Sequence, residues 1–93
     1  METTHVTDLY QASFYLVNGC TLEGVQCIPM AGGISCRLAF SGDRLDELTS
    51  AWFEKKAAAN LWAFRSAYSQ VTSWTTQAKR AYGQAGKRNG GGA

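Results

Sequence analysis

The sequence has little histidine and proline, and its C-terminal part has no negatively charged side chain. The sequence has one histidine and one proline, and no Asp or Glu follows Glu54. No window of about 18 residues is both apolar and uncharged, and the N-terminus lacks the apolar run of a signal peptide. The sequence therefore predicts neither a membrane span nor secretion, and we expect a cytoplasmic protein.

The motifs of catalysis and nucleotide binding are missing too. Neither the P-loop pattern nor the G-x-G-x-x-G pattern, which cradle phosphates, occurs in the sequence. The only histidine, His5, lies in a polar terminal stretch, so no preorganised Ser/His or Cys/His pair is evident. Asp43, Asp46 and Glu47 are explained by a place in the first turn of a helix, where carboxylates offset the helix dipole. We expect no enzyme and no cofactor.

The cysteines do not form a recognisable metal or redox motif. Cys20, Cys27 and Cys36 include no C-x-x-C pair, and with His5 they lack the closely spaced ligand pairs of structural zinc sites. Cys27 and Cys36 are predicted to point inward from two strands, where cysteine behaves as a small hydrophobe. If they face each other, a disulfide would need favourable geometry. The sequence predicts inert thiols and no bound metal.

Length and composition indicate one folded domain. The chain has 93 residues, and its hydrophobic content of 45% is far from the signature of disorder. Residues 1–6 are polar and are expected to be disordered. Residues 7–82 should form the domain, and residues 83–93 a flexible, basic, glycine-rich tail.

Two short helices are marked by their N-terminal signals. Thr7 or Asp8 can accept backbone hydrogen bonds at an N-cap, and Asn18-Gly19 should end that helix because glycine tolerates the left-handed conformation. Ser41-Gly42-Asp43 should begin a second helix, which carries an apolar stripe through Trp52 and Phe53.

A β-hairpin is predicted between these helices. Apolar residues alternate with others from Ile34 to Phe40, which is the period of a strand. The preceding strand, Thr21 to Ile28, changes phase near Gly24, and a β-bulge there would explain the shift. Pro29 to Gly33 should form the turn.

The chain is organised around a long helix from Asn60 to Tyr82. One stripe of this helix should face the core, with members three or four residues apart: Leu61, Phe64, Tyr68, Val71, Trp74, Ala78 and Ala81. Asn60 is a plausible N-cap, so we place a break near Ala58, although residues 54–59 favour helix and leave one continuous helix as the alternative. The predicted class is α+β, in the order helix, hairpin, helix, long helix.

One stretch resembles a known family. The run Thr7-Asp8-Leu9-Tyr10, then Ala12-Ser13-Phe14, Gly19 and Leu22-x-Gly24-Val25, is similar to a family of small bacterial domains of unknown function. The likeness covers roughly residues 7–82. It implies the same order of elements and a mobile-element or phage neighbourhood, and it brings no activity and no catalytic residues. The three cysteines and the glycine-rich basic tail depart from the family pattern.

The distribution of charge favours nucleic-acid binding. From Lys55 onward the chain has basic but no acidic residues, the footprint expected for phosphate contacts. Aromatic side chains on the same segment could stack on bases of RNA or DNA. The candidate contact residues are Lys55, Lys56, Arg65, Lys79, Arg80, Lys87, Arg88, Trp62, Trp74 and Tyr82.

A protein-interaction or assembly module is the alternative. The acidic first half and basic second half could meet between subunits, and the many aromatic residues could anchor an interface. Tyr68 and Trp74 also fit the core stripe, while Lys79 and Arg80 complement the negative end of a helix dipole. A homo-oligomer or a place in a larger complex is therefore the second hypothesis, and both can hold together.

Overall fold

The computed structural model describes residues 2–91, and their side chains as far as Gly83. The described elements are β1 (Glu2–Val6), α1 (Leu9–Val17), β2 (Thr21–Met30), β3 (Gly33–Gly42), α2 (Leu45–Phe53) and α3 (Leu61–Gly91). The predicted α+β class is confirmed, as is the order helix, hairpin, helix, long helix. The structure has one further element, the strand β1, before the first helix.

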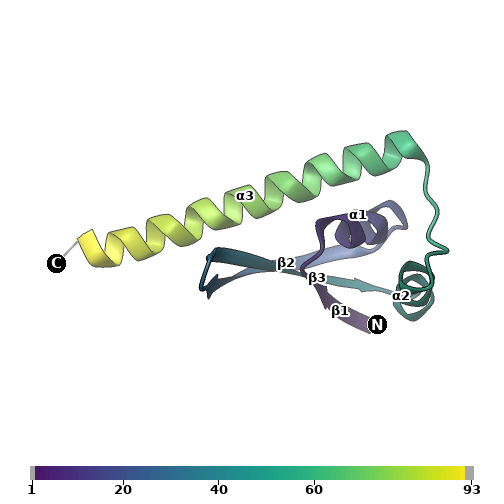
Figure 1. The fold of residues 1–93 in the computed structure, drawn as a ribbon, viewed down its shortest axis with the longest axis horizontal. Helices are drawn as coiled ribbons and strands as arrows, with labels where there is room; N and C mark the ends of the chain where they lie inside the picture. Colours follow the sequence, from purple (N-terminus) through teal and green to yellow (C-terminus); the bar gives the residue numbers. More distant parts are fainter. Residues whose placement is uncertain (1, 92–93) are drawn as a thin grey trace.

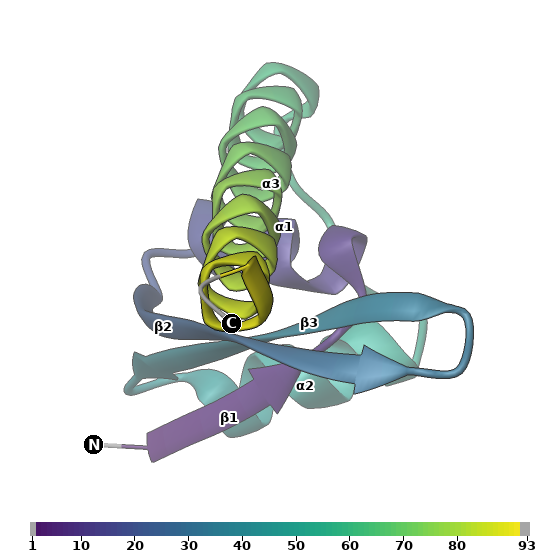
Figure 2. The same cartoon turned by 90° about the vertical axis from the view of Figure 1, so that its left-hand side faces the viewer.

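The strands form an antiparallel sheet in the order β1-β3-β2, so β3 is central. Both α1 and α3 lie on one face of this sheet, and α2 lies at its end (Figure 1). In the view along α3, α2 is seen behind the sheet and below α1 and α3 (Figure 2). The molecule is elongated because α3 continues past the hairpin.

The strand β1 corrects the expectation that residues 1–6 are disordered. Residues 2–6 pair with the end of β3, with His5 opposite Ala39 and Val6 opposite Leu38. Val6 is buried in the core. An edge strand whose neighbour supplies the hydrogen bonds can form with a single apolar side chain toward the core. The sequence of β1 is otherwise polar, so it lacks the alternating pattern that predicts a strand.

Local signals in the first half are confirmed. The Asp8 side chain accepts hydrogen bonds from the amides of Tyr10 and Gln11 at the start of α1. Gly19 ends this helix with φ of +85°, in the left-handed region. The register of β2 shifts between Leu22 and Gly24, as a bulge requires. The turn is tighter than expected, because Pro29 pairs with Ile34 inside the hairpin.

The predicted break before the long helix is also confirmed. Helix α2 ends at Phe53, and Asn60 caps α3 by accepting hydrogen bonds at Oδ1 from the amides of Trp62 (3.0 Å) and Ala63 (3.1 Å). At the other end, α3 continues beyond Tyr82 to Gly91, so most of the predicted tail is helical backbone. Residues 92–93 lie outside the described part, and the flexibility of the tail stays a prediction.

The core lies between the inner sheet face and the helices. Its centre holds Tyr15, Leu38, Phe40 and Val71, each fully buried. The predicted stripe of α3 holds only in its middle: Phe64, Tyr68, Trp74 and Ala78 are half-buried, while Leu61 and Ala81 are exposed. Ala67 and Thr75 are buried instead. Leu61 stands on the first turn of α3 and is 75% exposed.

Candidate nucleic-acid interface

The structure divides the predicted contact residues among separate places. Lys55 and Lys56 follow the end of α2, and Trp62 and Arg65 lie on the first turns of α3, at the other end of the connecting segment (Figure 1). Lys79 and Arg80 lie further along α3, Trp74 is half-buried against the core, and Tyr82 is 39% exposed. The side chains of Lys87 and Arg88 lie outside the described part of the chain. The group at the start of α3 therefore consists of Trp62 and Arg65.

Trp62 and Arg65 are in contact with each other. Both stand on the first turns of α3, three residues apart, a spacing that places side chains on one face of a helix. The Arg65 guanidinium lies over the indole at 5.8 Å from the ring centroid, a cation–π contact. The indole is nevertheless 69% exposed. With Ser66 and Ser69 these residues line a hollow of about 460 Å³.

The turn after α2 sets the positions of Lys55 and Lys56. Lys55 has φ of +61°, and the amides of Lys55 and Lys56 donate hydrogen bonds to the carbonyls of Trp52 and Ala51. This is a Schellman motif with lysine at the position that glycine usually takes. Lys56 lies 3.6 Å from Glu54, and both side chains are exposed. Lys55 has no acidic side chain within ion-pair distance in the described part of the chain.

Lys79 and Arg80 lie well away from this group. They follow Arg65 by about four turns, roughly 21 Å along the helix at 1.5 Å per residue. Both are exposed, and Lys79 borders a hollow of about 250 Å³ between α3 and the hairpin. The structure therefore places two basic positions along one rod. Between them the solvent side of α3 carries only uncharged polar side chains, among them Ser69, Gln70, Ser73 and Thr76.

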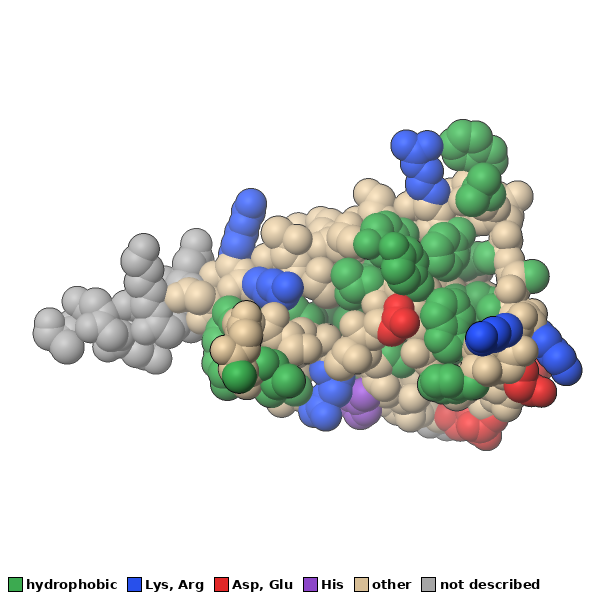
Figure 3. All heavy atoms as spheres, in the orientation of Figure 1, with side chains coloured by type: hydrophobic (Ala, Val, Ile, Leu, Met, Phe, Trp, Pro, Cys, Tyr) green, Lys and Arg blue, Asp and Glu red, His purple; other side chains and the backbone are tan. Residues whose placement is uncertain are grey.

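Sequence reasoning missed several exposed apolar side chains at the same end of the molecule. Tyr10, Phe53 and Leu61 are 56%, 70% and 75% exposed. The pattern had placed Phe53 and Leu61 in core stripes, and no sequence signal shows that the helices end before the core covers these positions. Figure 3 shows hydrophobic side chains gathered near the start of α3, with a basic side chain beside them.

Tyr10 belongs to a stack of aromatic rings between α1 and α3. Its ring is nearly parallel to that of Tyr68, at 5.0 Å between centroids, and to that of Phe64, at 6.5 Å. The neighbouring Tyr10 hydroxyl raises the pKa of Tyr68. The stack fixes the start of α3 against α1, and the position of Trp62 and Arg65 depends on it.

The thiols do not build a metal site. Cys27 and Cys36 face each other across the hairpin with their Sγ atoms 3.6 Å apart, and all three cysteines are free. Burial raises the pKa of Cys20, and burial together with Cys27 raises that of Cys36, which favours neutral thiols. Within residues 2–91, no three His, Cys, Asp or Glu side chains lie close enough to hold a metal ion.

Comparison with other proteins adds no further guide to the site. No family model, no curated protein and no solved structure matches the chain. The resemblance to a small bacterial domain therefore stays a prediction. None of the described helices combines the length and the apolar character needed to cross a membrane.

Proposed function

We propose that the chain binds single-stranded nucleic acid at the start of α3. The observation that carries the proposal is the grouping of an exposed indole, a guanidinium and two serine hydroxyls around one hollow, on a helix without acidic residues. Aromatic rings bind unpaired bases by stacking on them, and basic groups bind the phosphates that link those bases. This combination favours a single strand over a duplex, whose bases are already stacked.

Each residue has a distinct part in this binding mode. The 69% exposed face and edge of Trp62 offer a platform for one base. Arg65 supplies positive charge for the adjoining phosphate, and the hydroxyls of Ser66 and Ser69 can donate to phosphate or base oxygens. A strand that continues along the polar side of α3 would reach the second basic position, at Lys79 and Arg80.

The test compares binding of a labelled oligonucleotide of about 20 nucleotides by fluorescence anisotropy. For Trp62→Ala we expect weaker binding by about tenfold or more, because one stacked base contributes about 1–3 kcal/mol. Trp62→Phe is the matched control and should retain most of the affinity. For Arg65→Gln we expect a slope of log K against log salt that is shallower by about 0.7, the value for one phosphate contact on a single strand.

Unchanged affinity in both Trp62→Ala and Arg65→Gln would remove this site from the proposal. A wild-type affinity that does not fall with rising salt would remove nucleic acid altogether. Duplex of the same length should bind less tightly, since its bases cannot reach the indole.

The exposed apolar residues beside this site favour self-association as a second function. Leu61 lines a groove of about 170 Å³ together with Phe14, Trp52, Phe64 and neighbouring alanines, and Phe53 lines a second hollow that shares Trp52 and Ala57 with it. Exposed apolar groups that lie together typically mark an interface. The partner that fits is a second copy, because the exposed acids in the first turn of α2 and the basic residues of α3 are complementary in charge.

Light scattering after size-exclusion chromatography separates the two functions. If the groove joins two copies, Leu61→Ser should lower the measured mass to that of the monomer, while Trp62→Ala leaves the mass unchanged. A wild-type monomer at high concentration would refute self-association and leave nucleic-acid binding in place.

A further inference from the structure

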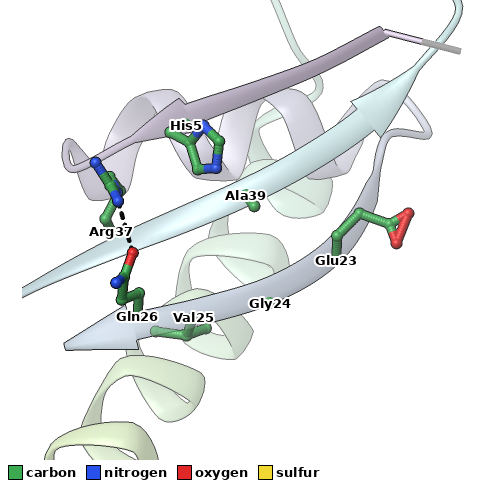
Figure 4. Close-up of a pocket in the computed structure, with 7 residues that line it drawn as sticks. All are labelled: His5, Glu23, Gly24, Val25, Gln26, Arg37 and Ala39. Carbon is green, nitrogen blue, oxygen red and sulfur yellow. Dashed lines mark hydrogen bonds between the residues drawn. The ribbon is translucent and has the colours of Figure 1, made fainter.

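The outer face of the sheet takes no part in the proposed function. It lies opposite α1 and α3 and carries side chains from all three strands (Figure 4). A cavity of about 220 Å³ opens on this face. Its polar lining residues are His5 from β1, Arg37 from β3, and Glu23 and Gln26 from β2.

Arg37, on the central strand, has unused hydrogen-bonding capacity. Its Nη2 donates to Oε1 of Gln26 at 2.6 Å, which fixes the guanidinium across the sheet. Its Nε is buried and has no hydrogen-bond partner. Within the described residues no carboxylate lies within ion-pair distance of it. The hydrogen bond to Gln26 is exposed, so the Nη groups of the guanidinium are the donors that an anion from outside this chain can reach.

His5 stands next to this donor. Its partner in the register is Ala39, two residues along β3 from Arg37, so His5 and Arg37 share the outer face as diagonal neighbours. Figure 4 shows the imidazole and the guanidinium on the same side of the ribbon, near one end of the cavity. Two groups that can donate hydrogen bonds to an anion therefore approach one space from adjacent strands.

The acidic lining residue does not occupy that space. Oε1 of Glu23 accepts a hydrogen bond of 2.7 Å from Oγ of Ser41. In Figure 4, Glu23 lies at the opposite end of the cavity from Arg37 and points away from it. The positive charge at the Arg37 end is therefore uncompensated.

We propose that Arg37 and His5 form a binding site for a phosphate group. A tetrahedral phosphate has oxygens directed toward both strands, so it can accept from an Nη of Arg37 and from the imidazole together. A carboxylate has two oxygens in one plane and fits a single guanidinium better than two donors on different strands. This site is separate from the start of α3 and does not depend on the function proposed there.

The test uses NMR of the uniformly ¹⁵N-labelled full chain, in which the Nε–H of arginine gives its own signal. Inorganic phosphate is titrated against chloride at constant ionic strength. We expect the Arg37 Nε–H signal to shift and saturate, together with the backbone amides of β1 around His5. The Nε–H signal of Arg44, whose guanidinium is paired with Glu47 on α2, is the internal control and should not follow the same curve.

Variants make the outcome decisive. Arg37→Lys keeps the charge but removes the planar guanidinium, and it should abolish saturable shifts at β1, while the matched variant Arg44→Lys should retain them. Should Arg37→Lys fail to fold, His5→Ala on the exposed edge strand gives the same test and should weaken binding severalfold. A linear, unsaturated response in the wild type, or equal responses in wild type and Arg37→Lys, would overturn the proposal.

A second titration identifies the source of the phosphate. Its probe is a dinucleotide, which carries one phosphodiester, and its result is compared with that for inorganic phosphate, which is a free anion. Saturation by both probes at Arg37 means that the site accepts the backbone of a nucleic acid, and saturation by inorganic phosphate alone means a free anion or a terminal monoester. Saturation by neither probe contradicts the site.

Discussion

Replacing Tyr15 by phenylalanine tests a buried polar network in the core. The Tyr15 side chain is fully buried. Its hydroxyl accepts a hydrogen bond of 2.9 Å from Nε2 of Gln11 and shares one of 2.7 Å with Oγ1 of Thr49. The contact with Thr49 joins α1 to α2, and Tyr15→Phe removes it without changing the ring that packs against Phe40.

The expected loss follows from the groups that remain. Gln11 is 8% exposed, so its amide would be left without a partner in a site that water barely reaches. A buried donor without a partner costs about 1–3 kcal/mol. Thr49 is half-buried and can turn to water, so it should add little. We therefore expect Tyr15→Phe to lower the free energy of unfolding by about 2 kcal/mol, which for a domain of this size lowers Tm by roughly 10 °C.

Urea unfolding followed by circular dichroism measures this difference, with Thr49→Val as the second arm of a double-mutant cycle. The two variants share one hydrogen bond, so their effects should not add, and the coupling energy should be about 1 kcal/mol. A loss below about 0.5 kcal/mol for Tyr15→Phe, or additive effects, would refute the argument that this network is buried and coupled.

Two further predictions concern the cap of α3 and the thiols. Asn60→Ala removes the acceptor for the amides of Trp62 and Ala63 and should lower the free energy of unfolding by about 1 kcal/mol, whereas Asn60→Asp should restore it; urea unfolding of both variants checks this. The pKa values of Cys20 and Cys36 are raised mainly by burial, so the unfolded chain loses these protons first, and the free energy of unfolding should fall as pH rises above about 8.5. The double variant Cys20→Ala/Cys36→Ala should flatten that dependence in urea unfolding at pH values between about 8 and 10, and an equally steep fall would show that other groups cause it.

The features that sequence predicted correctly are those that one or two residues determine locally. Asp8 and Asn60 cap helices because their side-chain oxygens reach the first free amides. Gly19 ends α1 because it adopts positive φ, and Gly24 marks the bulge of β2. Such signals depend on neighbouring residues only, so they need no knowledge of the tertiary structure.

The features that sequence missed depend on what lies beside a residue in space. β1 consists mostly of polar residues and becomes a strand because β3 is adjacent to it. Leu61 follows the correct period for the core, yet it is exposed because α3 begins before the rest of the fold reaches it. The candidate site was predicted in part: Trp62 and Arg65 come together, whereas the pairing of His5 with Arg37 needed the register of the sheet.

The position of β1 has a consequence for the order in which the sheet assembles. The β2–β3 hairpin closes a short loop, whereas β1 must find residues 38–42 across α1 and the whole hairpin, so it should join the sheet late. For the same reason β1 should detach first, and its amides should exchange with solvent faster than those of β3. An anion held by both His5 and Arg37 would slow this exchange, because β1 could not leave the sheet until the anion had dissociated.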